Sequence, residues 1–355
     1  MEKLLMKGNE AIGTAAIKSG CKFFFGYPIT PQNEIPEFMS RELPKVGGCF
    51  IQAESEVAAI NMVYGAAGTG ARCMTSSSSP GMSLKQEGIS YIVGAELPCL
   101  IVNVMRGGPG LGGIQPSQAD YFQATRGGGN GDYYMPVYAP ATVQETVDLI
   151  GRGFNVADKY RTPVMILIDG MTGQMMEPVV FSKEEKSEVI EKPWATTGTK
   201  EKREPNIINS LYLKPEELEE HCNKLFEKYE VIKNSECLWE EVNLDDAEIV
   251  LVAYGTTSRI TKNVMSSLRE EGLKVGMIRP ITVWPFPYDA IRNLKDNVKN
   301  ILVVEMSKGQ MIEDVRLGNE GRKKVHFYGR TGGIIPTPEE ITLKVREILK
   351  EGGDK

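Results

Sequence analysis

Histidine is scarce in this chain of 355 residues, which contains only His221 and His326. A histidine-centred catalytic triad, or a metal site built from several histidines, is therefore not expected. Lys and Arg do not gather into a basic stretch, and the net charge is -6. Nucleic-acid binding depends on clustered positive charge, so it is not expected either. No apolar run approaches the roughly 20 residues that span a bilayer, which argues against a membrane protein.

The six cysteines are widely spaced, at Cys21, Cys49, Cys73, Cys99, Cys222 and Cys237. This spacing excludes a C-x-x-C metal or cluster site built by this chain alone. A chain of this length can also bury a full core without a disulfide framework. We therefore expect free thiols in a cytoplasmic protein, and the charged start of the chain does not resemble a secretory signal. Any chemistry must use carboxylates, arginine, hydroxyls or a borrowed cofactor.

What the chain does contain is the composition of an ordinary globular protein, with 41% apolar and 25% charged residues. At about 150 residues per domain, the length predicts two domains. Strand-like apolar runs alternate with helix-like segments over residues 1–180, give way to a stretch rich in Lys and Glu over 181–246, and resume over 247–355. We predict a doubly wound α/β domain, a charged connecting arm and a smaller second α/β domain.

The strands predicted in the first domain are apolar nearly throughout, as expected where helices cover both faces of a parallel sheet. They are Lys22–Phe25, Cys49–Gln52, Arg72–Thr75, Cys99–Val104, Met135–Tyr138 and Pro163–Ile168. Helices are predicted from apolar periodicity and terminal glycines. They cover Glu10–Ser19, Val57–Ala67 and Val143–Asp158.

Helices and strands are predicted in the arm and in the second domain from the same kinds of pattern. A charged, solvated helix is predicted over Lys214–Lys228 in the arm. The second domain is predicted to contain strands Ile249–Ala253, Val275–Ile278, Ile301–Glu305 and Val325–Tyr328, with helices Ser258–Glu271 and Glu339–Glu351.

The segment Arg106-Gly107-Gly108-Pro109-Gly110-Leu111-Gly112-Gly113 formally contains G-x-G-x-x-G after a strand. However, Pro109 removes a backbone donor where a dinucleotide turn needs amide hydrogens, and no helix begins at once. A loop that closes over a site is the better interpretation, and Gly127–Gly131 extends it.

Polar residues follow four of the predicted strands, at Thr30, Glu56, Ser76–Ser79 and Arg106. Each of these residues can also have a purely structural role. Thr30 could cap a helix with Pro31 in its first turn, and an acidic residue such as Glu56 is favourable at a helix start. Ligands of open α/β sheets nevertheless bind at the carboxyl ends of the strands. Together these residues indicate a site for an anionic substrate and a cofactor.

Several motifs, in one order along nearly the whole chain, resemble the alpha subunit of 2-oxoacid:ferredoxin oxidoreductases. In the first domain they are Tyr27-Pro28-Ile29-Thr30-Pro31, Glu56-Val57-Ala58-Ala59, Ser78-Ser79-Pro80-Gly81 and Arg106-Gly107-Gly108-Pro109. In the second domain, Tyr254-Gly255-Thr256-Thr257, Arg279–Pro287 and Val304-Glu305-Met306 resemble a transketolase C-terminal-like domain. The likeness is greatest to the branched-chain, 2-oxoisovalerate type.

The resemblance implies that the first domain binds the pyrimidine of thiamine diphosphate. Glu56 would keep a proton and hydrogen-bond the pyrimidine N1′ atom, which activates the cofactor. Arg106 and Thr30 would hold the carboxylate and carbonyl of a 2-oxoacid. Tyr27, Pro28 and Ile29 would line the pyrimidine pocket. The implied reaction is oxidative decarboxylation with coenzyme A as co-substrate and ferredoxin as electron acceptor.

The resemblance also implies partner subunits. Gly131-Asp132 with Asn155 only approximates the family's magnesium motif, because Tyr133 stands in place of its second glycine, and we assign no metal ligand to this chain. A beta subunit would carry the diphosphate contacts, Mg²⁺ and [4Fe-4S] clusters, and a ferredoxin-like subunit would relay electrons to ferredoxin. Three alternatives stay open at this point: the 2-oxoglutarate type, a non-redox transketolase-like component, and a scaffold subunit without catalytic residues.

Overall fold

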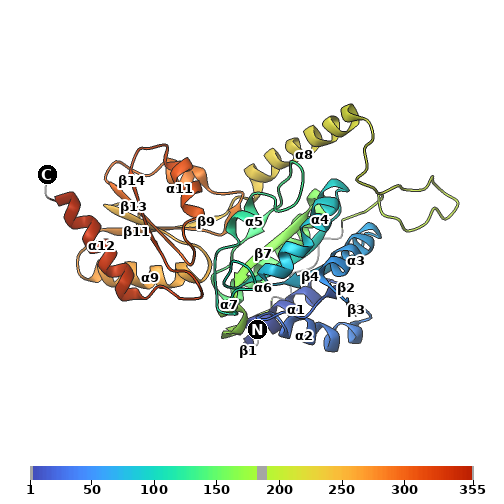
Figure 1. Cartoon of the computed structure of the whole chain (residues 1–355), viewed down its shortest axis with the longest axis horizontal. Coiled ribbons are helices and arrows are strands. Elements are labelled where there is room, and N and C mark those ends of the chain that lie inside the picture. Colours follow the sequence, from blue (N-terminus) through green and yellow to red (C-terminus); the bar gives the residue numbers. More distant parts are fainter. Residues whose placement is uncertain (1–2, 182–189, 354–355) are drawn as a thin grey trace.

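The computed structural model describes residues 3–181 and 190–353, and it contains two α/β units and an arm (Figure 1). The first unit is built on a seven-stranded sheet with the order β12-β6-β7-β5-β4-β2-β3. Its strands are β2 (Phe23–Gly26), β3 (Cys49–Gln52), β4 (Cys73–Ser77), β5 (Cys99–Met105), β6 (Val137–Tyr138), β7 (Pro163–Asp169) and β12 (Thr282–Trp284). All neighbours are parallel except β12 and β6.

Helices cover this sheet because its central strands are apolar on both faces, and every residue of β4, β5 and β7 is buried. The helices are α1 (Gly8–Lys18), α2 (Glu34–Glu42), α3 (Glu56–Gly68), α4 (Ser79–Gly94), α5 (Tyr121–Thr125), α6 (Val143–Tyr160) and α7 (Gly170–Gln174). α1 packs on α6, and α3 packs on α4. A separate antiparallel pair joins β1 (Leu4–Lys7) to β8 (Met176–Val179).

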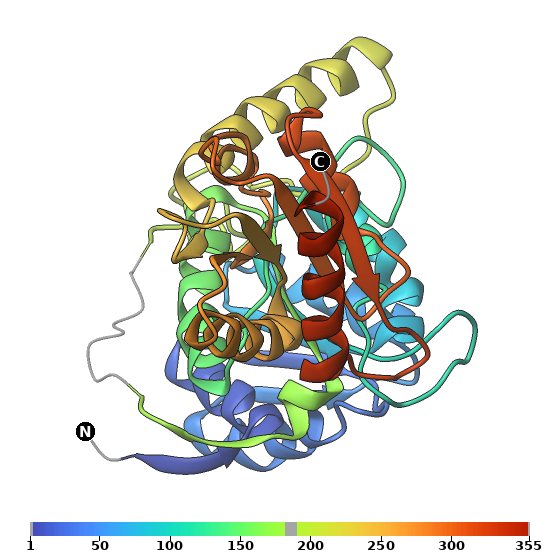
Figure 2. The same cartoon turned by 90° about the vertical axis from the view of Figure 1, so that its left-hand side faces the viewer.

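The second unit has a five-stranded sheet with the order β14-β13-β10-β11-β9. Its strands are β9 (Trp239–Val242), β10 (Ile249–Val252), β11 (Val275–Pro280), β13 (Asn300–Glu305) and β14 (Lys324–Gly329), and its helices are α9 (Gly255–Glu270), α10 (Tyr288–Arg292), α11 (Met311–Asn319) and α12 (Pro338–Gly353). α9 and α12 pack together, and Figure 2 shows α12 at the end of the molecule that faces the viewer.

The predicted α/β class is confirmed, and so are the predicted strands of both units to within one or two residues. β9 was not predicted. It lies inside the range assigned to the arm, yet it pairs antiparallel with β11 of the second sheet. β12 was not predicted either, and it follows β11 in sequence but forms the edge of the first sheet.

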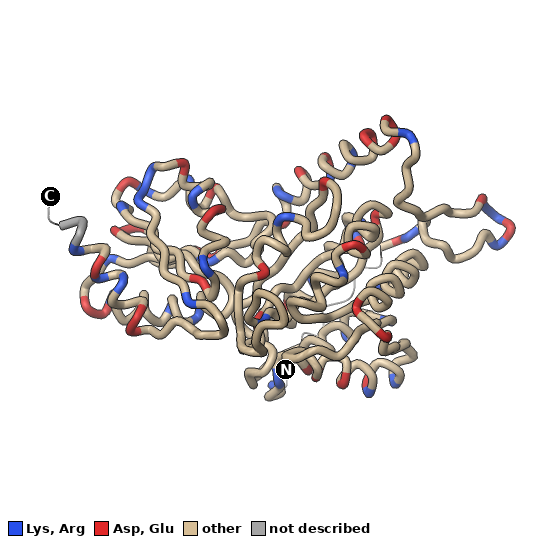
Figure 3. The backbone as a smooth tube through the Cα atoms, in the orientation of Figure 1, with Lys and Arg blue, Asp and Glu red and all other residues tan. Residues whose placement is uncertain are grey.

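The arm contains α8 (Pro215–Glu236), which is longer than the predicted helix and carries charged side chains along most of its length (Figure 3). Its few buried residues include Leu225, Tyr229 and Ile232. The part of the predicted arm at residues 182–189 lies outside the described residues.

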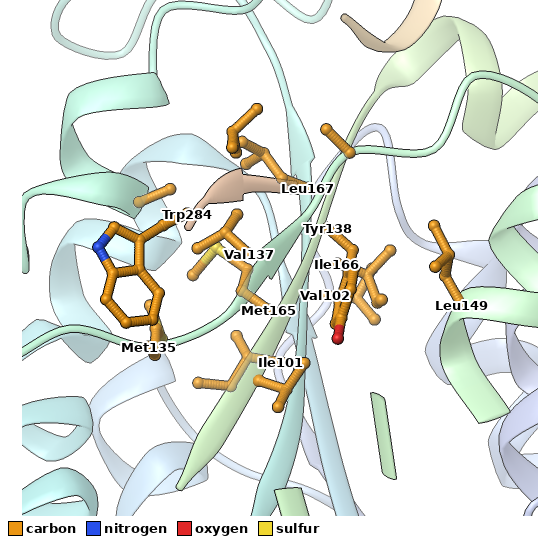
Figure 4. Close-up of a cluster of buried hydrophobic side chains, with 14 of the residues drawn as sticks. Ile101, Val102, Met135, Val137, Tyr138, Leu149, Met165, Ile166, Leu167 and Trp284 are labelled. Atoms are coloured by element: carbon orange, nitrogen blue, oxygen red, sulfur yellow. The ribbon is translucent and has the colours of Figure 1, made fainter. Parts of the chain in front are cut away.

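The two units share one hydrophobic core. Trp284 of β12 stacks on Tyr134 with ring centroids 5.0 Å apart, and Figure 4 shows it beside Met135 and Val137 of the first unit. Gln118 adds polar contacts, since its side-chain amide donates to Tyr254 O at 2.8 Å and accepts from Met306 N at 2.9 Å. The second unit is therefore held firmly against the first.

Candidate active site

The four polar segments that were expected to converge follow strands that are neighbours in the sheet, in the order β5-β4-β2-β3. These strands are parallel, so their carboxyl ends lie at one edge. Arg106 follows β5, Ser78 and Ser79 follow β4, Thr30 follows β2, and Glu56 follows β3. The fold therefore gathers the predicted residues at the carboxyl ends of the strands of the first sheet.

Glu56 is the first residue of α3, where the side chain of Ser55 caps the helix by accepting from Ala58 N at 3.2 Å. The Glu56 side chain is only 6% exposed. Its carboxyl group takes no part in this cap, and among the described residues no donor hydrogen-bonds to it. The residue is largely buried while its carboxyl group keeps no donor within the part of the chain that the structure describes, so the group can receive a donor from outside the chain.

Gly81 explains how the carboxyl group of Glu56 fits against the first turn of α4. A Cβ atom at this position would stand 2.6 Å from Glu56 Oε1 and 2.2 Å from Ser77 Oγ. Only glycine allows the carboxyl group to approach the backbone so closely. The hydroxyls of Ser77 and Ser78 are buried and have no hydrogen-bond partner within the described residues. At least one hydroxyl that is unpartnered in the described part of the chain, that of Ser77, therefore lies beside the carboxyl group of Glu56.

Arg106 is buried, and two backbone carbonyls hold its guanidinium group. Nη1 donates to Thr30 O at 2.9 Å, and Nη2 donates to Leu111 O at 3.1 Å. Its Nε–H has no partner among the described residues. The arginine therefore ties the turn after β2 to the glycine-rich loop and leaves its Nε–H without a partner among the described residues.

The turn after β2 differs from the expected helix start. Thr30 does not cap a helix, because α2 begins only at Glu34, after Asn33. A turn intervenes, in which Gln32 N donates to Ile29 O at 3.1 Å and the Thr30 hydroxyl accepts from Asn33 Nδ2 at 3.3 Å. Tyr27 and Pro28 are exposed on this turn, whereas the side-chain amide of Gln32 is buried and donates to Tyr27 O at 3.2 Å.

The glycine-rich loop is closed by its own backbone, since Gly107 N donates to Gln115 O and Gly113 N donates to Gly107 O, both at 2.9 Å. Its tip, residues 109–115, is exposed. A loop of the second unit lies against it: a Cβ on Gly333 would meet the side chain of Gln115 at 2.3 Å. Both units therefore contribute to this side of the site.

Two buried titratable residues were missed by the sequence analysis. Lys85 of α4 is 0% exposed and donates to Thr75 Oγ1 at 3.0 Å. Burial lowers the pKa of Lys85 to about 8, although the negative charge of Glu56 opposes the shift. Asp120 accepts from Ser79 Oγ at 2.6 Å and Asn103 Nδ2 at 3.0 Å, and burial raises its pKa. The sequence did carry a signal for Lys85, which interrupts an apolar stripe of helical spacing at Met82, Ile89 and Ile92.

Asn155, the residue considered and rejected as a magnesium ligand, lies in α6 and accepts a hydrogen bond from Arg72 Nη2 at 2.7 Å. Within residues 3–181 and 190–353, no three His, Cys, Asp or Glu side chains gather in a way that could hold a metal ion. In the same residues, no helix combines the length and apolarity that crossing a membrane requires.

Comparison with known proteins identifies the class to which this fold and site belong. Residues 14–238 match the family model described as pyruvate flavodoxin/ferredoxin oxidoreductase, thiamine diphosphate-binding, and residues 247–341 match the model of pyruvate:ferredoxin oxidoreductase core domain II. The chain belongs to the 2-oxoacid:ferredoxin oxidoreductase family, and it is a subunit of an oxidoreductase that acts on a 2-oxoacid.

Individual relatives refine this placement. The chain is 49% identical to the ketoisovalerate oxidoreductase subunit VorB of Methanothermobacter thermautotrophicus, with 100% of both chains covered. It is 40% identical to the 2-oxoglutarate synthase subunit KorA of Methanocaldococcus jannaschii, over 97% of this chain and 100% of the relative.

Among solved structures, the 2-oxoglutarate:ferredoxin oxidoreductase from Magnetococcus marinus superposes with a TM-score of 0.88 at 29% identity. That match covers 97% of this chain but only 65% of the other, which is therefore considerably longer. A split-gene transketolase superposes with a TM-score of 0.62 at 14% identity, over 97% of this chain and 98% of the other. The latter shows a shared fold only.

Proposed function

We propose that this chain is the alpha subunit of an enzyme that converts 2-oxoisovalerate and related branched-chain 2-oxoacids to acyl-coenzyme A and carbon dioxide, with reduction of ferredoxin. The observation that carries the proposal is the position of Glu56, a residue only 6% exposed whose carboxyl group lies against Gly81 and has no donor among the described residues. The substrate class is supported by the 49% identity to a ketoisovalerate oxidoreductase subunit over the full length.

The residues at the sheet edge fit the pyrimidine of thiamine diphosphate. The unpartnered hydroxyl of Ser77 and the space kept by Gly81 lie beside the carboxyl group of Glu56, and the hydroxyl of the neighbouring Ser78 is also unpartnered within the described residues. Thiamine diphosphate, when bound, supplies the electron sink on which a 2-oxoacid can lose carbon dioxide. In this assignment Glu56 holds a proton at its carboxyl group and shares it with N1′ of the pyrimidine.

The other predicted residues orient the reactants. Arg106 would direct its free Nε–H and its positive charge at the substrate carboxylate, in a geometry already fixed by the carbonyls of Thr30 and Leu111. The Thr30 hydroxyl would donate to the substrate carbonyl, since it accepts from Asn33 and keeps its own proton available. Tyr27, Pro28 and Ile29 would form the outer wall of the pyrimidine pocket, with Tyr27 and Pro28 exposed.

The remaining groups belong to partners in this proposal. A beta subunit would bring the diphosphate contacts, Mg²⁺ and [4Fe-4S] clusters, and ferredoxin-like subunits would carry electrons to ferredoxin. The widely separated cysteines and the exposed turn at Tyr27 and Pro28 support an active site completed by another chain. All six thiols are free, which is consistent with a cytoplasmic location.

The proposal is tested on the complex purified from its native host, with 2-oxoisovalerate, 2-oxoglutarate and pyruvate as substrates, coenzyme A as acyl acceptor and a viologen dye as electron acceptor. We expect the fastest dye reduction with 2-oxoisovalerate, in a complex that contains thiamine diphosphate and iron–sulfur clusters. A preference for 2-oxoglutarate would overturn the substrate but keep the reaction, in line with the 40% identity to a 2-oxoglutarate synthase subunit. Absence of dye reduction with every oxoacid would overturn the redox reaction itself.

A further inference from the structure

Lys85 is a fully buried lysine whose position no role proposed above requires. It lies in α4 between Met82 and Ile89, and all three side chains are 0% exposed. Burying an ammonium group is costly unless a partner compensates its charge. Its hydrogen bond to Thr75 Oγ1 at 3.0 Å satisfies one of its donors, and the Thr75 hydroxyl in turn donates a hydrogen bond to Phe25 O at 2.6 Å. A neutral hydroxyl does not balance a positive charge, so a negatively charged group is needed near Lys85 to compensate the charge of its ammonium group.

Lys85 lies about one helical turn beyond the point at which the carboxyl group of Glu56 meets α4. Thr75 and Ser77 are two residues apart in β4, so their side chains lie on the same face of the sheet. Gly81 and Lys85 are four residues apart in α4, so they lie on the same face of that helix. Ser77 faces Gly81 and Glu56, whereas Thr75 contacts Lys85. This face of β4 thus packs on this face of α4 at two successive positions. Ser77, Gly81 and Glu56 lie at the first position, and Thr75 and Lys85 lie at the second.

Glu56 is the charged group that acts on Lys85 in this pocket. The titratable groups whose charges influence Lys85 are Glu56 and the thiol of Cys99 in β5. Burial raises the pKa of Cys99 to about 12, so this thiol is neutral near pH 7. The carboxyl group of Glu56 is therefore the acidic group whose charge acts on the ammonium group of Lys85.

We propose that Lys85 is a positioning residue of the cofactor site, which balances the carboxylate of Glu56 in the cofactor-free chain and gives up its proton when Glu56 becomes neutral. This inference rests on the proposed function, in which Glu56 presents a proton to a pyrimidine. In the exchange the N–H bond at Lys85 Nζ breaks and an O–H bond at Glu56 forms, in net terms. The pair holds one proton and zero net charge before and after, so cofactor binding takes up no proton from solvent.

This arrangement has a measurable consequence for the binding of thiamine diphosphate to the assembled complex. While Lys85 holds the shared proton, the affinity for the cofactor should be nearly independent of pH between about pH 6 and 7, below the pKa of about 8 of Lys85. In Lys85→Met, Glu56 must take its proton from solvent, so the affinity should fall by up to about tenfold for each pH unit in that range. Calorimetry in buffers of different ionisation enthalpy should show uptake of about one proton by the variant at about pH 7 and almost none by the wild type.

A second variant and a matched control separate charge from packing. Thr75→Val keeps Lys85 but removes its hydroxyl partner, and it should move the pH at which affinity begins to fall to a lower value, whereas Thr75→Ser should not. Lys45→Met removes an exposed lysine of the first unit and should leave the profile unchanged. Variant complexes are compared only where gel filtration shows the wild-type assembly.

Equal proton uptake and equal pH profiles in wild type, Lys85→Met and Thr75→Val would overturn the role of Lys85. That outcome is distinct from failure of the proposed function, which would be seen as undiminished turnover in Glu56→Gln. A complex in which Glu56→Gln is inactive but Lys85→Met binds the cofactor with the wild-type pH profile would keep the former proposal and reject the latter.

Discussion

Arg106 donates a hydrogen bond from Nη1 to the carbonyl oxygen of Thr30 at 2.9 Å, across 76 positions of sequence. Together with the bond from Nη2 to Leu111 O at 3.1 Å, it fixes the orientation of the guanidinium group before any substrate arrives. Because both bonds go to backbone carbonyls, substitutions at Thr30 or Leu111 leave them in place. The arginine itself is the vulnerable partner.

Arg106→Lys should therefore weaken substrate binding. Lysine keeps the positive charge but has no planar fork, so it cannot satisfy both carbonyls and still face a carboxylate. We expect the KM for the 2-oxoacid to rise by at least about tenfold, equivalent to about 1.4 kcal/mol, with the KM for coenzyme A unchanged. Steady-state kinetics of the complex measure both. Arg41→Lys, at an exposed arginine, is the control, and an unaltered oxoacid KM in Arg106→Lys would contradict its assigned role.

Glu56→Gln should abolish turnover in the assembled complex while leaving the fold intact. Glutamine matches the carboxyl group in shape but cannot transfer a proton, and acid–base groups of this kind contribute about 10²–10⁴-fold in rate. Glu54→Gln is a closely matched control, since Glu54 is exposed two residues earlier. Dye reduction with 2-oxoisovalerate measures the effect. A Glu56→Gln complex that retained more than about a tenth of the wild-type rate would point to a scaffold role.

Gly81→Ala should damage the site without touching any reactive group. The added methyl group would stand 2.6 Å from Glu56 Oε1, so the carboxyl group has to move. We expect weaker binding of thiamine diphosphate, measured by calorimetry, and lower turnover. Gly65→Ala in α3 is the control because a Cβ there meets nothing within 4 Å, and it should stabilise the helix by about 0.5–1 kcal/mol. Unchanged cofactor affinity in Gly81→Ala would show that Glu56 need not occupy its present position.

Acid should release α8 from the first unit. Burial alone would raise the pKa of Glu96, but the ammonium groups of Lys228 and Lys224 lower it to about 2. The folded-state pKa is depressed, so the contact stabilises the arm above the ordinary value of 4.5 and is lost as the pH falls from 4.5 through 2. Hydrogen exchange over residues 215–236 should show decreasing protection in that range.

In Glu96→Gln, protection of α8 should already be reduced at pH 7 and should depend less on pH below 4.5. Glu87→Gln is the control, because Glu87 contacts only Tyr91 on the exposed side of α4. Identical exchange profiles of α8 in wild type and Glu96→Gln would show that other contacts, such as that of His221 with Gly94 O at 2.8 Å, hold the arm.

Much of the fold could be predicted because its central strands are buried on both faces and therefore appear as continuous apolar runs. β5 and β7 are examples, with every residue buried. β1 and β8 were missed for the opposite reason, since these four-residue strands pair only with each other and are largely half-exposed or exposed. β1 and β8 are more than 160 residues apart in the sequence, and the pattern of residues within each strand does not indicate that the two strands pair.

The candidate site was predictable where its residues stand at strand ends, as Glu56 and Arg106 do. The helix start considered at Thr30 was wrong because a turn forms there instead of a helix cap. Gln32 N donates a hydrogen bond to Ile29 O, and the buried side-chain amide of Gln32 donates one to Tyr27 O. Lys85 was missed although it interrupts an apolar stripe of α4, because its hydrogen bond to Thr75 of β4 and the effect of Glu56 of α3 depend on the tertiary fold. A single sequence does not show such contacts.

The placement of β12 affects the order in which this chain can fold during synthesis. The ribosome has to produce residues 282–284 before the edge of the first sheet at β6 can be covered and Trp284 can enter the core beside Tyr134. A nascent chain that ends after the arm thus exposes an open sheet edge and a vacant position in its core. Fragments cut at the arm are accordingly poor candidates for separate expression, and chaperones are expected to hold the growing chain until most of the second unit has emerged.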